Sequence, residues 1–185
     1  MDFLMKFTPD FIFDSIFCIT PDFFKSIGIS CIVCDIDNTL VTYDDPEPTP
    51  EVAKWLHEMT DAGIRFAFVS NNEVTRAELF NKSLGFACYG NAKKPLTKVV
   101  NRAVADFGVD KKHVATLGDQ VFTDVMAARF AHLGAAILVP PIKDLTNTFF
   151  KTKRVLERPL IKSYMKKHKE QTFKFESTVW DKKKK

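Results

Sequence analysis

Short apolar runs alternate with stretches of helical periodicity through most of this chain. Runs this short, rich in Val, Ile and Phe, are typical of strands whose two faces are both buried, and such strands belong to parallel sheets covered by helices on both sides. The expected strands are residues 29–34, 64–69, 86–89, 114–117 and 135–139, and the expected helices are 50–61, 73–83, 96–107 and 122–131. The pattern predicts an α/β, Rossmann-like fold with its ligand site at the carboxyl ends of the strands.

Three Thr-Pro pairs followed by an acidic residue mark expected helix starts. They are Thr8-Pro9-Asp10, Thr20-Pro21-Asp22 and Thr49-Pro50-Glu51. Each offers a hydroxyl as N-cap, a proline in the first turn and a carboxylate near the positive end of the helix dipole. The third start predicts a helix that buries Val52, Trp55, Leu56 and Met59 and ends at Gly63.

A chain of 185 residues is expected to form one domain with two attached ends. Residues 31–150 make up the predicted core of this domain. Residues 1–30 form a Phe-rich segment with two short helices, which either packs on the core or docks on a membrane. Its phenylalanines are Phe3, Phe7, Phe11, Phe13, Phe17, Phe23 and Phe24. Residues 151–185 are expected to form a basic helix and tail.

Charge is distributed unevenly along the chain, although the net charge is only +4. Residues 151–185 contain 13 Lys and Arg against 4 acidic residues, whereas residues 1–150 contain 14 against 19. The basic end is either a solvated tail or a contact for an anionic partner such as lipid headgroups or nucleic acid. A nucleic-acid-binding factor would carry its basic residues over a folded face, which makes nucleic acid the less favoured partner.

Localisation is expected to be cytoplasmic. The N-terminal residues show no apolar core and cleavage site of an export signal, and the chain has no run of about 18 apolar residues that could span a bilayer. Its sparse cysteines, Cys18, Cys31, Cys34 and Cys88, are typical of a reducing compartment.

The sequence CIVCDIDNTLV contains two candidate chemistries, a Cys-x-x-Cys pair and an Asp-x-Asp pair. In a strand, Cys31 and Cys34 point to opposite faces of the sheet, so they are expected to be buried thiols and neither a redox pair nor half of a metal site. Asp35 follows the strand directly and Asp37 comes two residues later, at the edge where a parallel sheet binds its ligand. Taken alone, the aspartate pair could equally be a loop cap.

Polar residues also follow the next predicted strands. Ser70 and Asn71 follow the second strand, Lys93 and Lys94 follow the third, and Asp119 and Asp124 follow the fourth. Singly, each has a simpler explanation, because Ser70 could cap the next helix and Asp119 could be an ordinary turn residue. Together they place carboxylates, a hydroxyl and a cation at one edge of the sheet.

The order Asp-x-Asp-x-Thr, Ser, Lys, Gly-Asp-x-x-x-x-Asp resembles the haloacid dehalogenase superfamily of Mg²⁺-dependent phosphatases. The stretches DIDNTLV, GIRFAFVSNN, KKPL and GDQVFTDV are similar to the YqeG-type phosphatases of subclass III, whose relatives include the mitochondrial phosphatidylglycerophosphate phosphatases.

This resemblance implies a role for each residue of the motif. Asp35 would be the nucleophile that forms an aspartyl-phosphate, and Asp37 the general acid and base. Mg²⁺ would be held by the Asp35 carboxylate, the Asp37 main-chain carbonyl and Asp119, with Asp124 as an auxiliary residue. Ser70, Asn71 and Lys94 would bind the phosphoryl group, and Ser70 and Lys94 would also count as catalytic.

The gaps 40–69 and 71–93 are too short to hold a large cap domain, so the site is expected to be open. An open site suits a large or membrane-embedded substrate, and the resemblance points to phosphatidylglycerophosphate in an anionic membrane that the protein contacts peripherally. The alternatives are a soluble sugar or nucleotide phosphate, a phosphorylated macromolecule, and a binding factor for nucleic acid or the ribosome that uses the basic tail.

Overall fold

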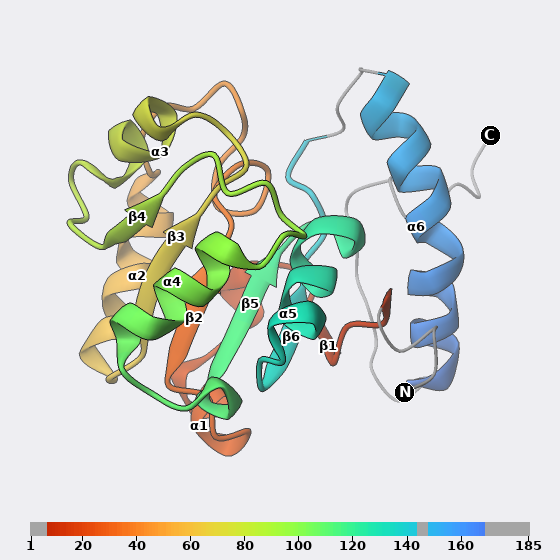
Figure 1. The fold of residues 1–185 in the computed structure, drawn as a ribbon, viewed down its shortest axis with the longest axis horizontal. Helices are drawn as coiled ribbons and strands as arrows, with labels where there is room; N and C mark the ends of the chain where they lie inside the picture. The colour runs from red at the N-terminus through yellow and green to blue at the C-terminus, as the bar shows by residue number, and fades with distance from the viewer. Residues whose placement is uncertain (1–6, 144–147, 169–185) are drawn as a thin grey trace.

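A computed structural model describes residues 7–143 and 148–168 of the chain. At its centre lies a sheet of six parallel strands in the order β1-β6-β5-β2-β3-β4 (Figure 1). The strands are β1 (Phe11–Ile12), β2 (Cys31–Cys34), β3 (Arg65–Val69), β4 (Ala87–Tyr89), β5 (Val114–Gly118) and β6 (Ala135–Leu138). The chain proceeds from β2 outward to β3 and β4 and then returns to the other side of β2 as β5. The strand order therefore reverses between β2 and β5, where an open α/β sheet binds its ligand.

Helices cover both faces of the sheet, as the alternating pattern predicted. One face carries α1 (Pro21–Ser26), α2 (Pro50–Asp61) and α3 (Val74–Asn81), and the other carries α4 (Lys98–Phe107) and α5 (Met126–Ala131). The expected start and buried face of α2 are confirmed, because Thr49 accepts a hydrogen bond from Val52 N and all four predicted apolar residues are buried. Single helices fill the connections β2–β3 and β3–β4, so no large cap domain is inserted there.

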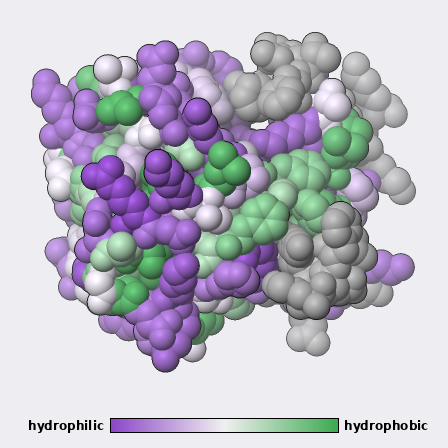
Figure 2. Space-filling view, viewed as in Figure 1, coloured by the Kyte–Doolittle hydropathy of each residue, from purple (hydrophilic) through white to green (hydrophobic). Residues whose placement is uncertain are grey.

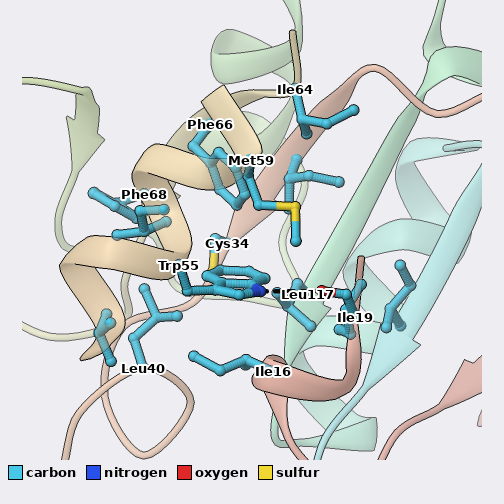
Figure 3. Packing of buried hydrophobic residues seen from close by; sticks show 14 of the residues in the cluster. Ile16, Ile19, Cys34, Leu40, Trp55, Met59, Ile64, Phe66, Phe68 and Leu117 are labelled. Carbon is cyan, nitrogen blue, oxygen red and sulfur yellow. Dashed lines mark hydrogen bonds between the residues drawn. The ribbon is translucent and has the colours of Figure 1, made fainter. Parts of the chain in front are cut away.

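Two hydrophobic clusters make up the core, one on each face of the sheet. Cys31 belongs to one cluster and Cys34 to the other, and both are fully buried and unpaired. In Figure 3, Cys34 lies beside Trp55, whose Nε1 donates a hydrogen bond to Ile19 O over 3.1 Å. The cysteines are therefore packing residues of β2, the strand that ends at Asp35.

The expected helix at Thr8-Pro9-Asp10 is wrong, and so is the expectation that residues 1–30 hold two helices of this kind. The chain instead enters β1, where Asp10 N donates to Ala136 O (2.8 Å) and the Asp10 carboxylate accepts from Ala136 N (2.7 Å). Pairing with the exposed edge of β6 satisfies more backbone groups than one helical turn, so tertiary pairing overrides the local capping signal. The second start is confirmed by α1, which Thr20 caps.

Most of the described N-terminal phenylalanines pack against the core. Phe24 is fully buried, Phe11, Phe13 and Phe23 contact the same cluster, and Phe7 packs edge-on against Phe122. Phe17, in contrast, is 53% exposed. Phe3 lies outside the described residues.

Two helices begin at other residues than predicted. The helix expected over 96–107 begins at Lys98, which leaves Leu96 63% exposed. The helix expected over 122–131 opens with a π-helical turn, η4 (Val121–Val125), before α5 begins. This wide turn begins two residues after Asp119.

The last described element is α6 (Thr148–Lys167), which begins near the carboxyl edge of the sheet and runs back along the side of the domain (Figure 1). Ile161 and Tyr164 are buried against the core, and the Tyr164 hydroxyl donates to Asp10 O over 2.9 Å. Figure 2 shows a band of hydrophobic residues between α5 and α6, whereas the left part of this face is mostly hydrophilic. None of the described helices is both long and apolar enough to cross a membrane. Lys182–Lys185 lie outside the described residues.

Candidate active site

The polar residues predicted from successive strand ends meet at the carboxyl edge of β2, β3 and β5. They surround a cavity of about 250 Å³ lined by Asp35, Asp37, Tyr43, Ser70, Asn71, Asn72, Lys94, Gln120 and Thr123. Carboxylate oxygens of Asp35, Asp119 and Asp124 lie within 4.8 Å of one another beside it. Five of the seven predicted site residues thus line one cavity, and Asp119 and Asp124 lie against it.

Asp35 is held in place by two side chains as soon as β2 ends. Lys94 Nζ donates to Asp35 Oδ1 over 2.6 Å, and Thr39 Oγ1 donates to Asp35 Oδ2 over 3.1 Å. Burial raises the pKa of Asp35 to about 7, and the positive charge of Lys94 limits this rise. A carboxylate in this environment is poorly solvated, which increases its reactivity once it has lost its proton.

Lys94 is a buried cation shared by two carboxylates. Its Nζ donates to Asp35 and, over 2.7 Å, to Asp124 Oδ1. Burial lowers the pKa of Lys94, but the carboxylates of Asp124 and Asp35 outweigh burial and hold that pKa above its ordinary value. The Asn71 side chain binds both main-chain polar groups of Lys94, with Lys94 N donating to Oδ1 over 2.6 Å and Nδ2 donating to Lys94 O over 3.2 Å. Asn71 therefore positions this lysine.

Asp37 contacts a different pair of residues. Ser70 Oγ donates to Asp37 Oδ2 over 3.1 Å, and Arg76 Nη2 lies 3.1 Å from Asp37 Oδ1. Arg76 also donates to the carbonyl oxygens of Asp45 (2.7 Å) and Pro46 (3.1 Å), so it ties the loop after β2 to the site. Sequence reasoning missed Arg76, because a single arginine within α3 has no local feature that distinguishes it from a surface residue.

Asp124 points back toward the end of β5 from the π-helical turn η4. Its Oδ2 accepts hydrogen bonds from Gln120 N (3.2 Å) and Thr123 Oγ1 (3.1 Å), while Oδ1 accepts from Lys94. Gly118 leaves the space for this carboxylate, because a Cβ there would lie 2.2 Å from Asp124 Cγ. The geometry therefore gives Asp124 the task of holding Lys94.

Asp119 is completely buried, and α6 reaches across to it. Arg154 donates to the Asp119 main-chain oxygen through Nη1 and to Oδ2 through Nη2. Asp119 Oδ1 is buried without a hydrogen-bond partner in the described part of the chain. Sequence reasoning also missed Arg154, since it lies 35 residues from Asp119 and belongs to the stretch interpreted as a basic tail.

The residues present fit a divalent cation. Five buried carboxylates have three ion-paired cationic partners among the described residues, and half-buried Lys153 is a further cation nearby, so the carboxylates outnumber the cations. The carboxylates belong to Asp35, Asp37, Asp119, Asp124 and Glu157, and the ion-paired cations are Lys94, Arg76 and Arg154. A buried carboxylate oxygen without a donor is costly unless a cation approaches it, and Asp119 Oδ1 is such an atom. An all-oxygen site is the kind that Mg²⁺ prefers.

Comparison with known proteins agrees with this geometry. Residues 21–132 match the family of haloacid dehalogenase-like hydrolases. The chain is 35% identical over 161 residues to "Probable phosphatase YqeG" of Bacillus subtilis (strain 168), an alignment that covers 87% of this chain and 93% of that protein. A solved structure of an uncharacterized protein from Listeria monocytogenes serotype 4b shares the fold, with a TM-score of 0.52 at 16% identity, over 64% of this chain and 85% of that one. The chain therefore belongs to the haloacid dehalogenase-like hydrolases.

Proposed function

We propose that this hydrolase is a phosphatase that cleaves phosphomonoesters with Mg²⁺ through an aspartyl-phosphate on Asp35. The observation that carries the proposal is the grouping of Asp35, Asp119 and Asp124 within 4.8 Å beside a cavity that also contains Asp37, Ser70 and Lys94. The similarity to a protein named as a probable phosphatase supports the same reaction.

In the first step, an Asp35 oxygen attacks phosphorus and the bond from phosphorus to the ester oxygen breaks. Asp37 gives its proton to that departing oxygen, so the alcohol leaves neutral. In the second step, Asp37 takes a proton from water, the hydroxide attacks phosphorus, and the bond to Asp35 breaks to release phosphate. Asp37 can serve both steps because it lies on the cavity wall without contacting Lys94, which is bound to Asp35.

Positioning and charge neutralisation are the main requirements of phosphoryl transfer. Lys94 would offset the negative charge of the phosphoryl oxygens, and Ser70 would turn its hydroxyl from Asp37 to one of them. Because the Asn71 side chain is engaged by Lys94, its contact with phosphate would come from the main-chain N–H. Mg²⁺, held by Asp35, Asp119 and the Asp37 carbonyl, would screen the repulsion between the anionic nucleophile and the anionic ester.

For the substrate we propose phosphatidylglycerophosphate, in line with the resemblance to subclass III phosphatases and their mitochondrial relatives. The uncapped site favours an ester whose bulk stays outside the small cavity. A larger groove of about 580 Å³ is lined in part by the loop after β2, through Thr39 and Leu40. The exposed side chains of Phe17 and Ile142 also line it. The apolar part of an amphiphilic ester would contact this groove, whereas a sugar phosphate has no apolar part to place there.

The mechanism is tested with Asp35→Asn, which keeps the shape of the side chain but removes the nucleophile. We expect hydrolysis of a generic aryl phosphate to require Mg²⁺, to stop with a chelator, and to fall at least about a thousandfold in this variant. The exposed Asp61→Asn on α2 is the matched control and should keep full activity. Retained activity in Asp35→Asn would remove Asp35 as the nucleophile.

The substrate is tested by phosphate release from phosphatidylglycerophosphate in anionic vesicles, compared with soluble sugar and nucleotide phosphates and a phosphoprotein. We expect the highest kcat/KM for the lipid, because its apolar part would contact the apolar groove while its phosphate occupies the small cavity. Higher kcat/KM for a soluble ester or the phosphoprotein would favour that substrate class. Tight RNA binding without any hydrolysis would instead support the binding factor.

A further inference from the structure

We infer that Arg154 of α6 is a positioning residue that orients Asp119 toward the metal ion. This inference rests on the metal site of the proposed function. Arg154 lies outside the sequence motifs of the site and reaches Asp119 only because the C-terminal helix packs against the domain.

The contacts of Arg154 fix Asp119 at two points. One guanidinium nitrogen binds the Asp119 main-chain oxygen and another binds Oδ2, so both the backbone and the side-chain rotamer are held. The remaining oxygen, Oδ1, has no donor among the described residues. Because the planar guanidinium holds both the main-chain oxygen and Oδ2 of Asp119, the carboxylate cannot rotate freely, and Oδ1 is directed away from the arginine.

A second carboxylate fixes Arg154 in turn. Glu157, one turn further along α6, accepts from Arg154 Nη1 at Oε2 (3.1 Å) and from Phe122 N at Oε1 (3.1 Å). Glu157 is fully buried and Arg154 is only 9% exposed. The helix is therefore attached to the π-helical turn η4, which carries Asp124, and Arg154 cannot move away from Asp119 without breaking this attachment.

Residues that form hydrogen bonds with metal-binding side chains commonly change metal affinity by a factor of about 10–100. Arg154 would do so here by paying the cost of ordering Asp119 before the ion arrives. A cation near a metal site can also lower metal affinity, because the guanidinium and the ion compete for Asp119. The two effects have opposite signs, so metal binding distinguishes them.

The experiment measures Mn²⁺ binding to the full chain by EPR of the free ion, a readout independent of activity. Arg154→Met removes both hydrogen bonds but keeps the length of the side chain, and Arg154→Lys keeps the charge without the fork. Glu157→Gln leaves Arg154 in place and weakens its anchor. Lys162→Ala is the control, because Lys162 is exposed on the same helix.

We expect the Mn²⁺ Kd to rise about 10- to 100-fold in Arg154→Met, less in Arg154→Lys and Glu157→Gln, and not at all in Lys162→Ala. In aryl phosphate hydrolysis, the metal concentration for half-activation should rise, while kcat at saturating metal changes much less. Unchanged or tighter Mn²⁺ binding in Arg154→Met would overturn the inference, and if this variant does not fold, unchanged binding in Glu157→Gln would do the same. Absence of Mn²⁺ binding in the wild-type protein would overturn the proposed metal site as well.

Discussion

At the scale of single residues, the site is built around a buried cation. Lys94 has two carboxylate partners, Asp35 and Asp124, and all three side chains are largely withdrawn from water. A charge buried in this way must be paired, since an isolated ion in a protein interior costs several kcal/mol. Asp35 nevertheless retains a raised pKa, because burial and the nearby carboxylates of Asp124 and Asp119 outweigh Lys94. In the proposed mechanism, protons and Mg²⁺ therefore compete for the Asp35 carboxylate.

This competition predicts how stability depends on pH. With a pKa near 7 in the folded protein against 3.8 when unperturbed, protonated Asp35 stabilises the metal-free fold at low pH, and this contribution is lost as pH rises through 7. Mg²⁺ requires the carboxylate, so its apparent affinity should fall about tenfold per pH unit below 7, or roughly a hundredfold at pH 5.

The measurement is the Tm with and without subsaturating Mg²⁺ at pH 5 and pH 8. We expect the Mg²⁺-induced increase in Tm to be much larger at pH 8. Asp35→Asn, which cannot titrate, should show a small increase at either pH. Equal Mg²⁺ effects at both pH values in the wild-type protein would contradict a titrating ligand at this position.

At the scale of elements, the transition from β5 into η4 places both Asp119 and Asp124. The turn η4 begins two residues after Asp119 and includes Asp124; it is π-helical, which is wider than an α-helical turn and recurs at functional sites. This turn brings Asp124 back over Gly118, where its carboxylate occupies the space that a side chain would need. The glycine at the end of β5 is therefore required by close packing, although its φ angle is ordinary.

Gly118→Ala tests this packing. The added Cβ would lie 2.2–2.6 Å from the Asp124 carboxyl group, so either Asp124 or the strand end must move, at a cost of about 1–3 kcal/mol in free energy of unfolding. Because Asp124 holds Lys94, aryl phosphate hydrolysis should fall at least about tenfold. Urea unfolding and initial rates measure the two effects.

Gly63→Ala provides the comparison for the Gly118 variant. Gly63 has a φ of 91° and open space around its Cβ position, far from the site. Gly63→Ala should lower the free energy of unfolding by about 1 kcal/mol without lowering activity. If Gly118→Ala behaves like Gly63→Ala, the close approach of Asp124 to Gly118 has no functional consequence.

At the scale of the whole molecule, the described part of the basic C-terminal stretch belongs to the folded domain. The helix α6 is part of the catalytic domain, since Arg154 and Glu157 are buried against the site and Tyr164 against the N-terminal segment. The exposed lysines of α6, Lys151, Lys162, Lys166 and Lys167, and the basic residues after His168 are the candidates for contact with an anionic surface. The Phe-rich N-terminal segment contributes mainly core packing, with Phe17 as its exposed aromatic side chain.

A truncation after His168 tests whether the last residues contribute to the proposed membrane contact, and it keeps every described residue of the site. Residues 169–185 contain six lysines and three acidic residues, and each basic residue near an anionic bilayer contributes about 1 kcal/mol. We expect the truncated chain to co-sediment with anionic vesicles at least about tenfold more weakly at low salt, with unchanged activity on a soluble aryl phosphate. Neutral vesicles serve as the control, and equal binding of both chains would argue against the tail.

Much of this architecture could be predicted from local sequence. The alternation of apolar runs and helical periodicity determined the parallel sheet, because a strand without a polar face needs helices on both sides. Strand periodicity alone separated Cys31 from Cys34, and the polar residues that follow β2, β3, β4 and β5 gathered at one edge because parallel strands end on the same side. These features depend on residues close together in the chain.

Only the tertiary structure decided the features that depend on distant partners. Asp10 leads into strand β1 instead of starting a helix because the edge of β6 was available to pair with this segment. Arg76 and Arg154 joined the site because helix packing brought them to Asp37 and Asp119, and no pattern around either arginine marks that contact. Local sequence thus determined which elements form and which polar residues follow each strand. The fold decided how buried charges pair, because their partners can come from anywhere in the chain.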